Sequence, residues 1–541
     1  MQPGRREARS ILGRRIPEPV TDDAPILSIR AISHEDVAGP PLAKRCRVLR
    51  QTTLTFVLLL GAPAAAQERG RSIDVRQAVA LAAHNNPKLA AAGVDVTIAD
   101  ANVISAAGVD DFLWDASAAW NRSRLEYVPG TPVQQTKGDD VLLSTSLTRL
   151  LPTGGTVGLR LSTDFARGEY VSDFGSGPQT STATYQAPSV QLFAAHPLLR
   201  GVGERVARAQ RHRAVVARSV AGLERDATAA TVVRDVVVAY WDTLEASEER
   251  GILDALAESA RQQLEAVQAA ISVEKQPPSA SAEVKVAVAL RQDAAIAAEQ
   301  TLRAQSAELS RLLGVDADPG VAPWNMTDTA DVVPTGASFD AALASAMDHN
   351  PHLAAIRERG RSAAIDVDVR RNGTLPELDL AVSGGTLGNA IDAGSAFAQL
   401  GTFHTYNMQI ALIAQEPIGR HAARGALQAA SEELHKTKLV ETDVAAQIRS
   451  AVVREVGVID GAARRIAALA DAIDAATLDL AAERARFEVG RATNFDVLRR
   501  QQELAETRLR LLRARIDYLE ATTAIEALTG DILPHYGVVV R

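Results

Sequence analysis

Few residue patterns in this chain of 541 residues have the spacing that catalysis or ligand binding requires. The segment GVGERV (201–206) has two glycines but lacks the third glycine of a dinucleotide-binding loop. His84 and His349 stand in two similar phrases, HNNPKLAAA (84–92) and DHNPHLAAI (348–356). We interpret both histidines as surface residues at helix ends and not as metal ligands. No phosphate-binding GxxxxGKS/T sequence, nucleophile elbow, HExxH motif or EF-hand loop occurs. We therefore expect no enzymatic activity, no metal and no cofactor.

The composition points to packed helices. Hydrophobic residues make up 46% of the chain and charged residues 23%, while aromatic residues are only 4% and alanine is abundant. Such a chain favours long helices that approach each other closely. A net charge of −8 argues against binding to nucleic acid. Cys46 is the one cysteine, which excludes an intramolecular disulfide and a cysteine metal site.

The N-terminal part resembles a secretory signal. Basic KRCRVLR (44–50) precedes apolar TLTFVLLLGA (53–62), and small residues follow, so we expect a signal peptide over 44–66 with cleavage between Ala66 and Gln67. The alternative is a buried hydrophobic helix. Residues 1–43 are expected to be a disordered extension, or the true start lies further on.

No uninterrupted run of 18 apolar residues follows residue 66, so we expect no membrane-spanning helix there. An exported chain of this kind is secreted, periplasmic or part of an outer-membrane barrel.

The two similar phrases mark two copies of one plan. Each opens with a short helix, over 72–85 and 338–350, for which Asp74 and Asp340 are candidate N-terminal caps. In each phrase an asparagine then caps a second helix whose first turn holds a proline, where the missing N–H costs nothing. The phrases are thus predicted to be corners where one helix ends and the next begins.

Strands are expected after each corner, at about 115–200 in the first copy and 375–418 in the second. The first copy is longer here, and its excess contains 140–165, which alternates on both sides of PTGG and predicts a hairpin. This hairpin either adds two strands to a shared barrel or stands outside the membrane; we favour the external hairpin.

Two long helices should close each copy. Apolar residues recur at intervals of three and four, and predict helices at 203–273 and 280–313, then at 420–489 and 494–529. Helices of this length must pack along one another as coiled coils. The first repeat thus covers 72–314 and the second 338–530, with a C-terminal tail at 531–541.

Neither repeat has enough strands to close a barrel, and open sheet edges are not tolerated in lipid. If the strands enter a membrane, several chains must share one barrel. Twelve of the 21 aromatic residues fall within 111–195 and 376–418, as expected for the aromatic girdles of a membrane barrel. Aromatic residues also favour strands in general.

The most specific stretch is RARFEVGRATNFDVLRRQQELAETRLRLLRARIDYLEATTAIEALTG (484–530). It resembles the outer-membrane efflux protein family, the TolC-like channels, and the matching residues are Phe487, Gly490, Asp496, Val497, Leu498, Tyr518 and Gly530. Weaker matches are Asn86-Pro87, Asn350-Pro351, LPEL (375–378) and AARGAL (422–427). The tandem plan over 72–530 also fits, because family members contain two such repeats.

The resemblance implies a mainly α-helical chain with a β-barrel portion, assembled as a homotrimeric α-barrel/β-barrel channel. The barrel would lie in the lipid of the outer membrane and the helical part in the periplasm. An inner-membrane pump would deliver small toxic molecules or proteins through a periplasmic adaptor protein, as in tripartite efflux or type I secretion. The rival interpretation is a periplasmic coiled-coil adaptor or scaffold that does not enter the membrane.

The resemblance also implies sites at the tip of the second helix pair. Asp496 matches a gate aspartate, and three copies around an axis would repel one another and raise its pKa. Arg499 stands where a second aspartate is expected and could pair with Asp496 at i, i+3. The tip turn is the candidate adaptor contact: Val489, Gly490, Arg491, Ala492 and Thr493. The first tip (272–288) lacks this glycine–turn–Asp-Val-Leu pattern.

Overall fold

A computed structural model describes residues 71–274, 277–317 and 322–539. The predicted extension at 1–43 and the signal peptide at 44–66, with Ala66 and Gln67, lie outside the described residues. The described residues belong to one compact unit.

The first repeat begins with a short strand and two helices, then four long strands and a long helix pair. Its elements are β1 Ser72–Ile73, α1 Val75–Asn85, α2 Pro87–Ala107, the 3-10 turn η1 Gly108–Asp110, β2 Phe112–Arg124, β3 Val133–Leu150, β4 Thr156–Ser172, β5 Gln179–Pro197, α3 Glu204–Ala207, α4 Ala209–Ser272 and α5 Ala280–Leu312.

The second repeat follows the same plan with two strands in place of four. Its elements are β6 Asn325–Met326, α6 Phe339–His349, α7 Pro351–Asn372, β7 Glu377–Leu387, α8 Ala393–Leu400, β8 Tyr406–Gln415, α9 His421–Glu488, α10 Asn494–Thr529 and α11 Ile532–His535. The predicted tail thus contains α11. Asp74 caps α1 in a capping box as predicted, whereas the prediction for Asp340 is wrong. Ser338 is the N-cap of α6, and Asp340 lies in the first turn.

The repeated phrases build equivalent corners. Asn86 accepts a hydrogen bond from the Lys88 amide (2.9 Å) and donates its side-chain amide to the Leu312 carbonyl at the end of α5 (2.8 Å). Asn350 likewise caps α7 and donates to the Leu528 carbonyl near the end of α10 (3.1 Å). Each asparagine therefore starts one helix and satisfies a carbonyl at the end of another, which explains why the phrase occurs twice.

The closing glycines fit against these corners. Gly314 and Gly530 have φ of +69° and +81°, a conformation that side chains disfavour. A Cβ on Gly314 would lie 2.5 Å from the Asn85 carbonyl oxygen, and a Cβ on Gly530 would lie 2.9 Å from that of His349. Both positions therefore require glycine.

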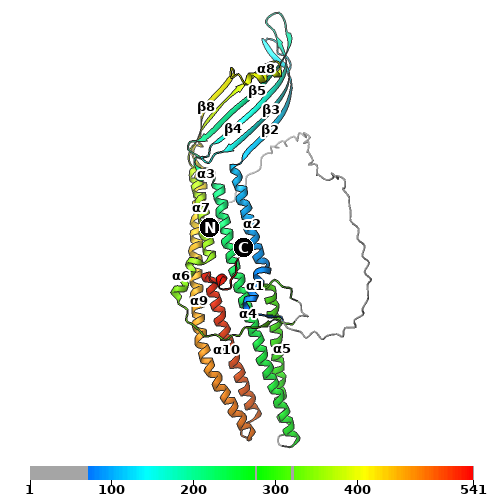
Figure 1. Cartoon of the computed structure of the whole chain (residues 1–541), viewed down its shortest axis with the longest axis vertical. Coiled ribbons are helices and arrows are strands. Elements are labelled where there is room, and N and C mark those ends of the chain that lie inside the picture. Colours follow the sequence, from blue (N-terminus) through cyan, green and yellow to red (C-terminus); the bar gives the residue numbers. More distant parts are fainter. Residues whose placement is uncertain (1–70, 275–276, 318–321, 540–541) are drawn as a thin grey trace, which may run out of the picture. The chain divides into compact units, whose positions relative to one another are not determined.

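The long helices lie side by side. Next to the sheet, α2 contacts α4, α4 contacts α7, and α7 contacts α9; further from the sheet, α5 pairs with α4 and α10 lies between α4 and α9 (Figure 1). The tips of the α4–α5 and α9–α10 pairs lie at the end away from the strands (Figure 1).

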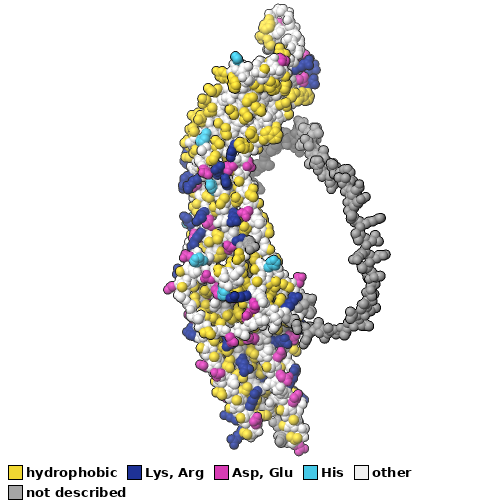
Figure 2. Space-filling model, viewed as in Figure 1, with side chains coloured by type: hydrophobic (Ala, Val, Ile, Leu, Met, Phe, Trp, Pro, Cys, Tyr) yellow, Lys and Arg dark blue, Asp and Glu magenta, His cyan; other side chains and the backbone are white. Residues whose placement is uncertain are grey.

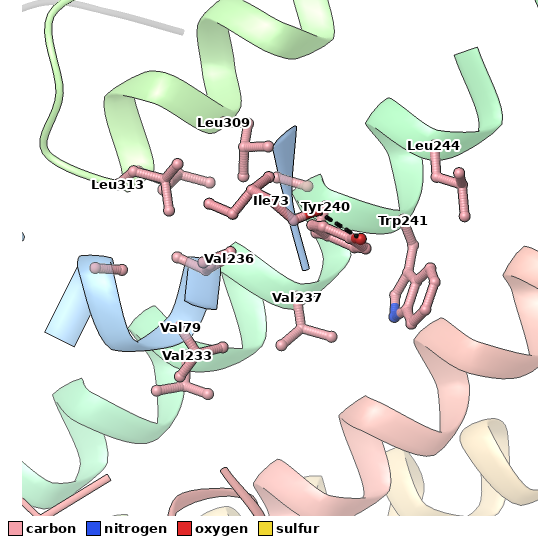
Figure 3. Close-up of a cluster of buried hydrophobic side chains, with 14 of the residues drawn as sticks. Ile73, Val79, Val233, Val236, Val237, Tyr240, Trp241, Leu244, Leu309 and Leu313 are labelled. Carbon is pink, nitrogen blue, oxygen red and sulfur yellow. Dashed lines mark hydrogen bonds between the residues drawn. The ribbon is translucent and has the colours of Figure 1, made fainter. Parts of the chain in front are cut away.

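The largest hydrophobic core joins the two repeats at the level of the Asn86 and Asn350 corners. Tyr240 of α4 is fully buried among residues from α1, α5, α10 and α11, and stands edge-on to Trp241 (ring centroids 5.2 Å apart). Its hydroxyl donates to the Asp328 carboxylate (2.7 Å), accepts from the Asp328 amide (3.3 Å) and lies 3.2 Å from the Ile73 carbonyl oxygen (Figure 3). Burial and this carboxylate raise the pKa of Tyr240. The buried hydroxyl is therefore fully satisfied.

The six long strands form one antiparallel sheet in the order β2-β3-β4-β5-β7-β8. The predicted hairpin around PTGG is present as β3 and β4, and the preference for an external hairpin is wrong. Strand β3 pairs with β2 along all of β2, and β4 pairs with β5 from Thr156 to Ser172. The turn of this hairpin lies near the helices, because the Gly203 amide donates to the Thr153 carbonyl (2.9 Å).

One described segment, Pro87–Asp110, is long and apolar enough to cross a membrane by length and composition alone. Its mean hydropathy is high because alanine and valine surround its few charges. Leu89, Val96 and Ala99 are buried, and Asp100 pairs with Arg218 of α4 (2.9 Å). A charged pair in the middle argues that α2 is a packed helix of the bundle.

Candidate functional site

The predicted tip residues form a tight turn between α9 and α10. Val489 follows the last residue of α9, and Gly490 has a φ of +73°. Thr493 is the N-cap of α10. Val489 is 68% exposed, so the turn presents an apolar side chain to its surroundings. Sequence analysis placed this turn correctly because its capping residues and glycine have strong local signatures.

Asp496 is the third residue of a capping box. Its carboxylate accepts hydrogen bonds from the Thr493 hydroxyl (2.6 Å) and amide (3.0 Å). These bonds, with weaker attraction from Arg499 and Arg500, lower the pKa of Asp496. In the single chain the shift is therefore opposite to the rise expected for three copies that repel one another. Arg499 pairs with Glu503 (3.8 Å), and the expected pair with Asp496 does not form.

Two polar links join the helix pairs above the tips. The Gln263 side-chain amide on α4 donates to Asn494 at the start of α10 (2.6 Å). Arg291 of α5 is only 8% exposed and donates to the Leu498 carbonyl (2.8 Å) and to the Gln501 side chain (3.1 Å) on α10.

Arg291 is a residue that sequence analysis missed. Its hydrogen-bond acceptors are neutral carbonyl oxygens, and no ion pair involving it occurs among the described residues. Since no negative charge offsets the burial of the guanidinium, the pKa of Arg291 is lowered. Charged residues spaced along α5 resemble an ordinary solvated helix face, and only the packing of α10 on α4 and α5 places this one inside.

A group of carboxylates surrounds one arginine where α10 packs on α4. Arg513 lies 2.5 Å from Glu245, 2.9 Å from Asp517, 3.7 Å from Glu520 and 4.0 Å from Asp242. Burial, followed by repulsion from Asp242, raises the pKa of Glu520 to about 8. Asp517 also pairs with Arg465 (2.7 Å), but two guanidinium groups do not compensate four carboxylates, so a proton on Glu520 relieves the excess charge.

This cluster predicts a pH-dependent stability. Because the folded-state pKa of Glu520 is raised from 4.5, its stabilising contribution is complete below pH 4.5 and is lost as the pH rises through about 8. We expect Glu520→Gln to flatten the fall in melting temperature between pH 5 and 9. Thermal unfolding of the detergent-solubilised protein measures this, with Glu506→Gln as an exposed control on the same helix. Equal pH slopes for wild type and Glu520→Gln would contradict the assignment.

The six-stranded sheet has one apolar face. Residues directly opposite each other in paired strands lie on the same face, and alternate residues lie on opposite faces. One row across all six strands is Trp114, Leu147, Leu159, Leu192, Gly384 and Met408. Trp114, Leu192 and Met408 are 70%, 63% and 73% exposed, and hydrophobic side chains cover the strands in Figure 2.

The other face of the sheet is polar. The adjacent row is Asp115, Ser146, Arg160, Gln191, Gly385 and Asn407. Asp115 accepts a hydrogen bond from Ser146, and Arg160 lies over the ring of Phe193 (5.3 Å). A sheet that is apolar on one face and polar on the other is the pattern of a membrane barrel with an aqueous interior.

The apolar face has a limited height. On β4 it runs from Val157 to Phe165, and Arg167 follows; on β2 it runs from Phe112 to Trp120, and Arg122 follows. Nine residues cover about 27 Å along a strand. At the tilt of a barrel strand this becomes about 20 Å, close to the apolar band of outer-membrane barrels.

Charged side chains gather where the sheet meets the helices (Figure 2). Asp110, between α2 and β2, pairs with Arg208 (2.6 Å) and Arg211 (2.8 Å), and Arg200 after β5 pairs with Glu377 at the start of β7. These pairs fix the strands to the helices from which they emerge. They also place polar groups at the edge of the apolar face, as a membrane surface requires.

The described fold is shared with outer-membrane channels of known structure. VceC from Vibrio cholerae aligns with a TM-score of 0.60 and 14% identity, over 84% of this chain and 96% of that chain. The channel CmeC of Campylobacter jejuni gives 0.57 and 14%, over 84% and 85%, and the channel MtrE of Neisseria gonorrhoeae 0.59 and 14%, over 85% and 89%. At these identities the likeness shows the fold.

Sequence comparison supports the resemblance over the second repeat. Residues 342–531, most of the second repeat, match the model of the outer membrane efflux protein family. The resemblance predicted from the sequence is thus confirmed, and this segment contains the tip turn and Asp496. A search of curated proteins found no match.

Proposed function

We propose that three copies of this chain form a passive channel in the outer membrane, through which an inner-membrane pump exports small toxic molecules or proteins. The observation that carries the proposal is the two-faced sheet, whose apolar rows span about one membrane thickness. A periplasmic adaptor or scaffold, the rival function, has no use for an exposed apolar face of this size.

The edges of the sheet support assembly. Among the described residues, the strands β2 and β8 have no neighbour on their outer sides, and such edges cannot remain open in lipid. Successive strands are antiparallel and six in number, so β8 of one copy runs antiparallel to β2 of the next. The helices repeat this order, since α2 leads into β2 and β8 leads into α9. Identical copies can therefore close into a ring with one repeated seam.

The helical tips would face the periplasm, where the adaptor contact falls on Val489–Thr493. The tip turn is exposed and apolar at Val489, which suits docking to another protein. The channel needs no chemistry of its own, because the pump supplies the energy.

Membrane fractionation followed by unheated gel electrophoresis tests the proposal. We expect the protein in the outer-membrane fraction, as an oligomer that migrates as a monomer only after boiling. Recovery as a soluble monomer would contradict it and favour the periplasmic scaffold.

The gate role of Asp496 has its own test. Asp496→Asn keeps a side chain that can accept from Thr493 but removes the charge, so a channel lined by three such aspartates should become less cation-selective. Thr493→Ala is the matched control, because it removes the cap and keeps the charge. Reversal potentials in planar bilayers measure the selectivity, and an equal change in both variants would assign Asp496 to capping alone.

A further inference from the structure

The β3–β4 hairpin is built into the wall of the sheet. Seventeen residues of β4 pair with β5, and β3 pairs with β4 on its other side. At the turn, the Thr153 carbonyl accepts from the Gly203 amide (2.9 Å), and a Cβ on Gly154 would lie 2.3 Å from the Gly201 carbonyl oxygen. The hairpin therefore starts at the same level as the neighbouring strands and is fixed to the corner between β5 and α3.

The hairpin also shares the two faces of the sheet. Leu143 and Leu161 lie in apolar rows, while Ser144 and Ser162 lie in a polar row with Ser117 and Ser189. The serine hydroxyls at the two ends of this row form close pairs, Ser117 with Ser144 (2.9 Å) and Ser162 with Ser189 (2.8 Å). A hairpin outside the membrane would have no reason to continue an apolar band strand by strand.

The extra strands change the width of the sheet. Strands about 4.8 Å apart and tilted by about 40° occupy about 6.3 Å of circumference each, so six strands occupy about 38 Å. Four strands at the same tilt would occupy only about 25 Å.

The helices that meet the sheet have the same width. Four of them, α2, α4, α7 and α9, lie side by side there. At helix spacings of 8–10 Å they occupy about 36 Å, which agrees with six strands and exceeds four by roughly half. This agreement holds for each copy, whatever number of copies closes the ring.

We infer that the β3–β4 hairpin widens the membrane barrel to the bore of the helical tube, so that the passage does not narrow where the sheet meets the helices. The inference rests on the proposed channel function. With three copies the barrel has eighteen strands and a backbone diameter of about 36 Å. At the level of the serine row the side chains add little bulk to this bore, because strands β2 to β5 each contribute serine there. Such a barrel passes any cargo that the helical tube admits, including unfolded polypeptide segments.

Cysteine pairs in the serine row test the strand order inside the assembled protein. In a Cys46→Ser background, the pairs Ser117→Cys/Ser144→Cys and Ser162→Cys/Ser189→Cys should form disulfides on mild oxidation. The pair Ser117→Cys/Ser189→Cys should not, because two strands separate these positions by about 14 Å. Mass spectrometry of the oligomer from the outer-membrane fraction identifies the linked peptides.

The outcomes separate this inference from the proposed function. A disulfide between positions 117 and 189, or none at 117/144 and 162/189, in an outer-membrane oligomer would overturn the wide barrel and leave the channel intact. Absence of the protein from the outer membrane would instead overturn the channel. Electron microscopy of the wild-type oligomer in end view gives a second measurement, with a barrel as wide as the helical tube expected and a clearly narrower barrel contradicting the inference.

Discussion

Leu161→Arg should prevent the protein from assembling in the outer membrane. Leu161 lies in the middle of the apolar rows on β4, between Val190 of β5 and Thr145 of β3. An arginine near the midplane of the lipid face of a barrel costs about 2–4 kcal/mol. Three copies would incur this cost together, so we expect loss of the heat-sensitive oligomer and of protein in the outer-membrane fraction.

Ser162→Arg is the matched control, because it places the same side chain one residue away on the opposite face. In the assembled channel this face borders water, where substitutions alter selectivity more than stability. We therefore expect Ser162→Arg to reach the membrane and to form the oligomer. Equal amounts of oligomer for both variants would contradict the assignment of the faces.

Leu309→Ala should destabilise the junction of the two repeats by about 2–5 kcal/mol. Leu309 of α5 is fully buried and packs in the same core as Tyr240 and Leu313 (Figure 3). Its loss leaves a cavity where α1, α4, α5 and α10 meet, and the surrounding helices are too long to collapse locally. Thermal unfolding of the solubilised protein should show a clearly lower melting temperature.

Val333→Ala serves as the comparison, since Val333 is 89% exposed in the segment between the repeats. Its effect should stay within about 0.5 kcal/mol. If Leu309→Ala unfolds at the wild-type temperature, the core described around Tyr240 does not hold the repeats together.

Local signals made the helical frame predictable. Helix starts at Asn86 and Asn350, the tip turn at Gly490 and the capping box at Thr493 each depend on neighbours within four residues, which the sequence displays directly. For the same reason, the predicted ends of the long helices lie within a few residues of the observed ends. Sequence analysis also identified the hairpin around PTGG, because alternation and turn residues are local.

Apart from the cap of α6, which is Ser338 and not Asp340, the misses depend on tertiary contacts. Whether β3 and β4 join the sheet depends on pairing with β2 and β5, and alternation alone does not distinguish that arrangement from a free hairpin. Arg291 is buried only because α10 packs over it, and the pKa of Glu520 is raised because the packing of α10 on α4 buries its carboxyl group and brings Asp242 beside it. The contacts of Arg291 and Glu520 join segments more than 200 residues apart, and strand pairing depends on the register of whole strands, so neither appears in the local periodicity of the sequence.

Labelling of intact cells with a membrane-impermeant maleimide tests most directly whether this chain spans the outer membrane. Ser176 lies in the β4–β5 loop, at the end of the sheet away from the helices, and Ala492 lies in the tip turn of α9–α10. In a Cys46→Ser background, Ser176→Cys should label from outside the cell, and Ala492→Cys only after the outer membrane is permeabilised. Labelling of neither position before permeabilisation, and of both afterwards, would place the whole chain in the periplasm and contradict the channel.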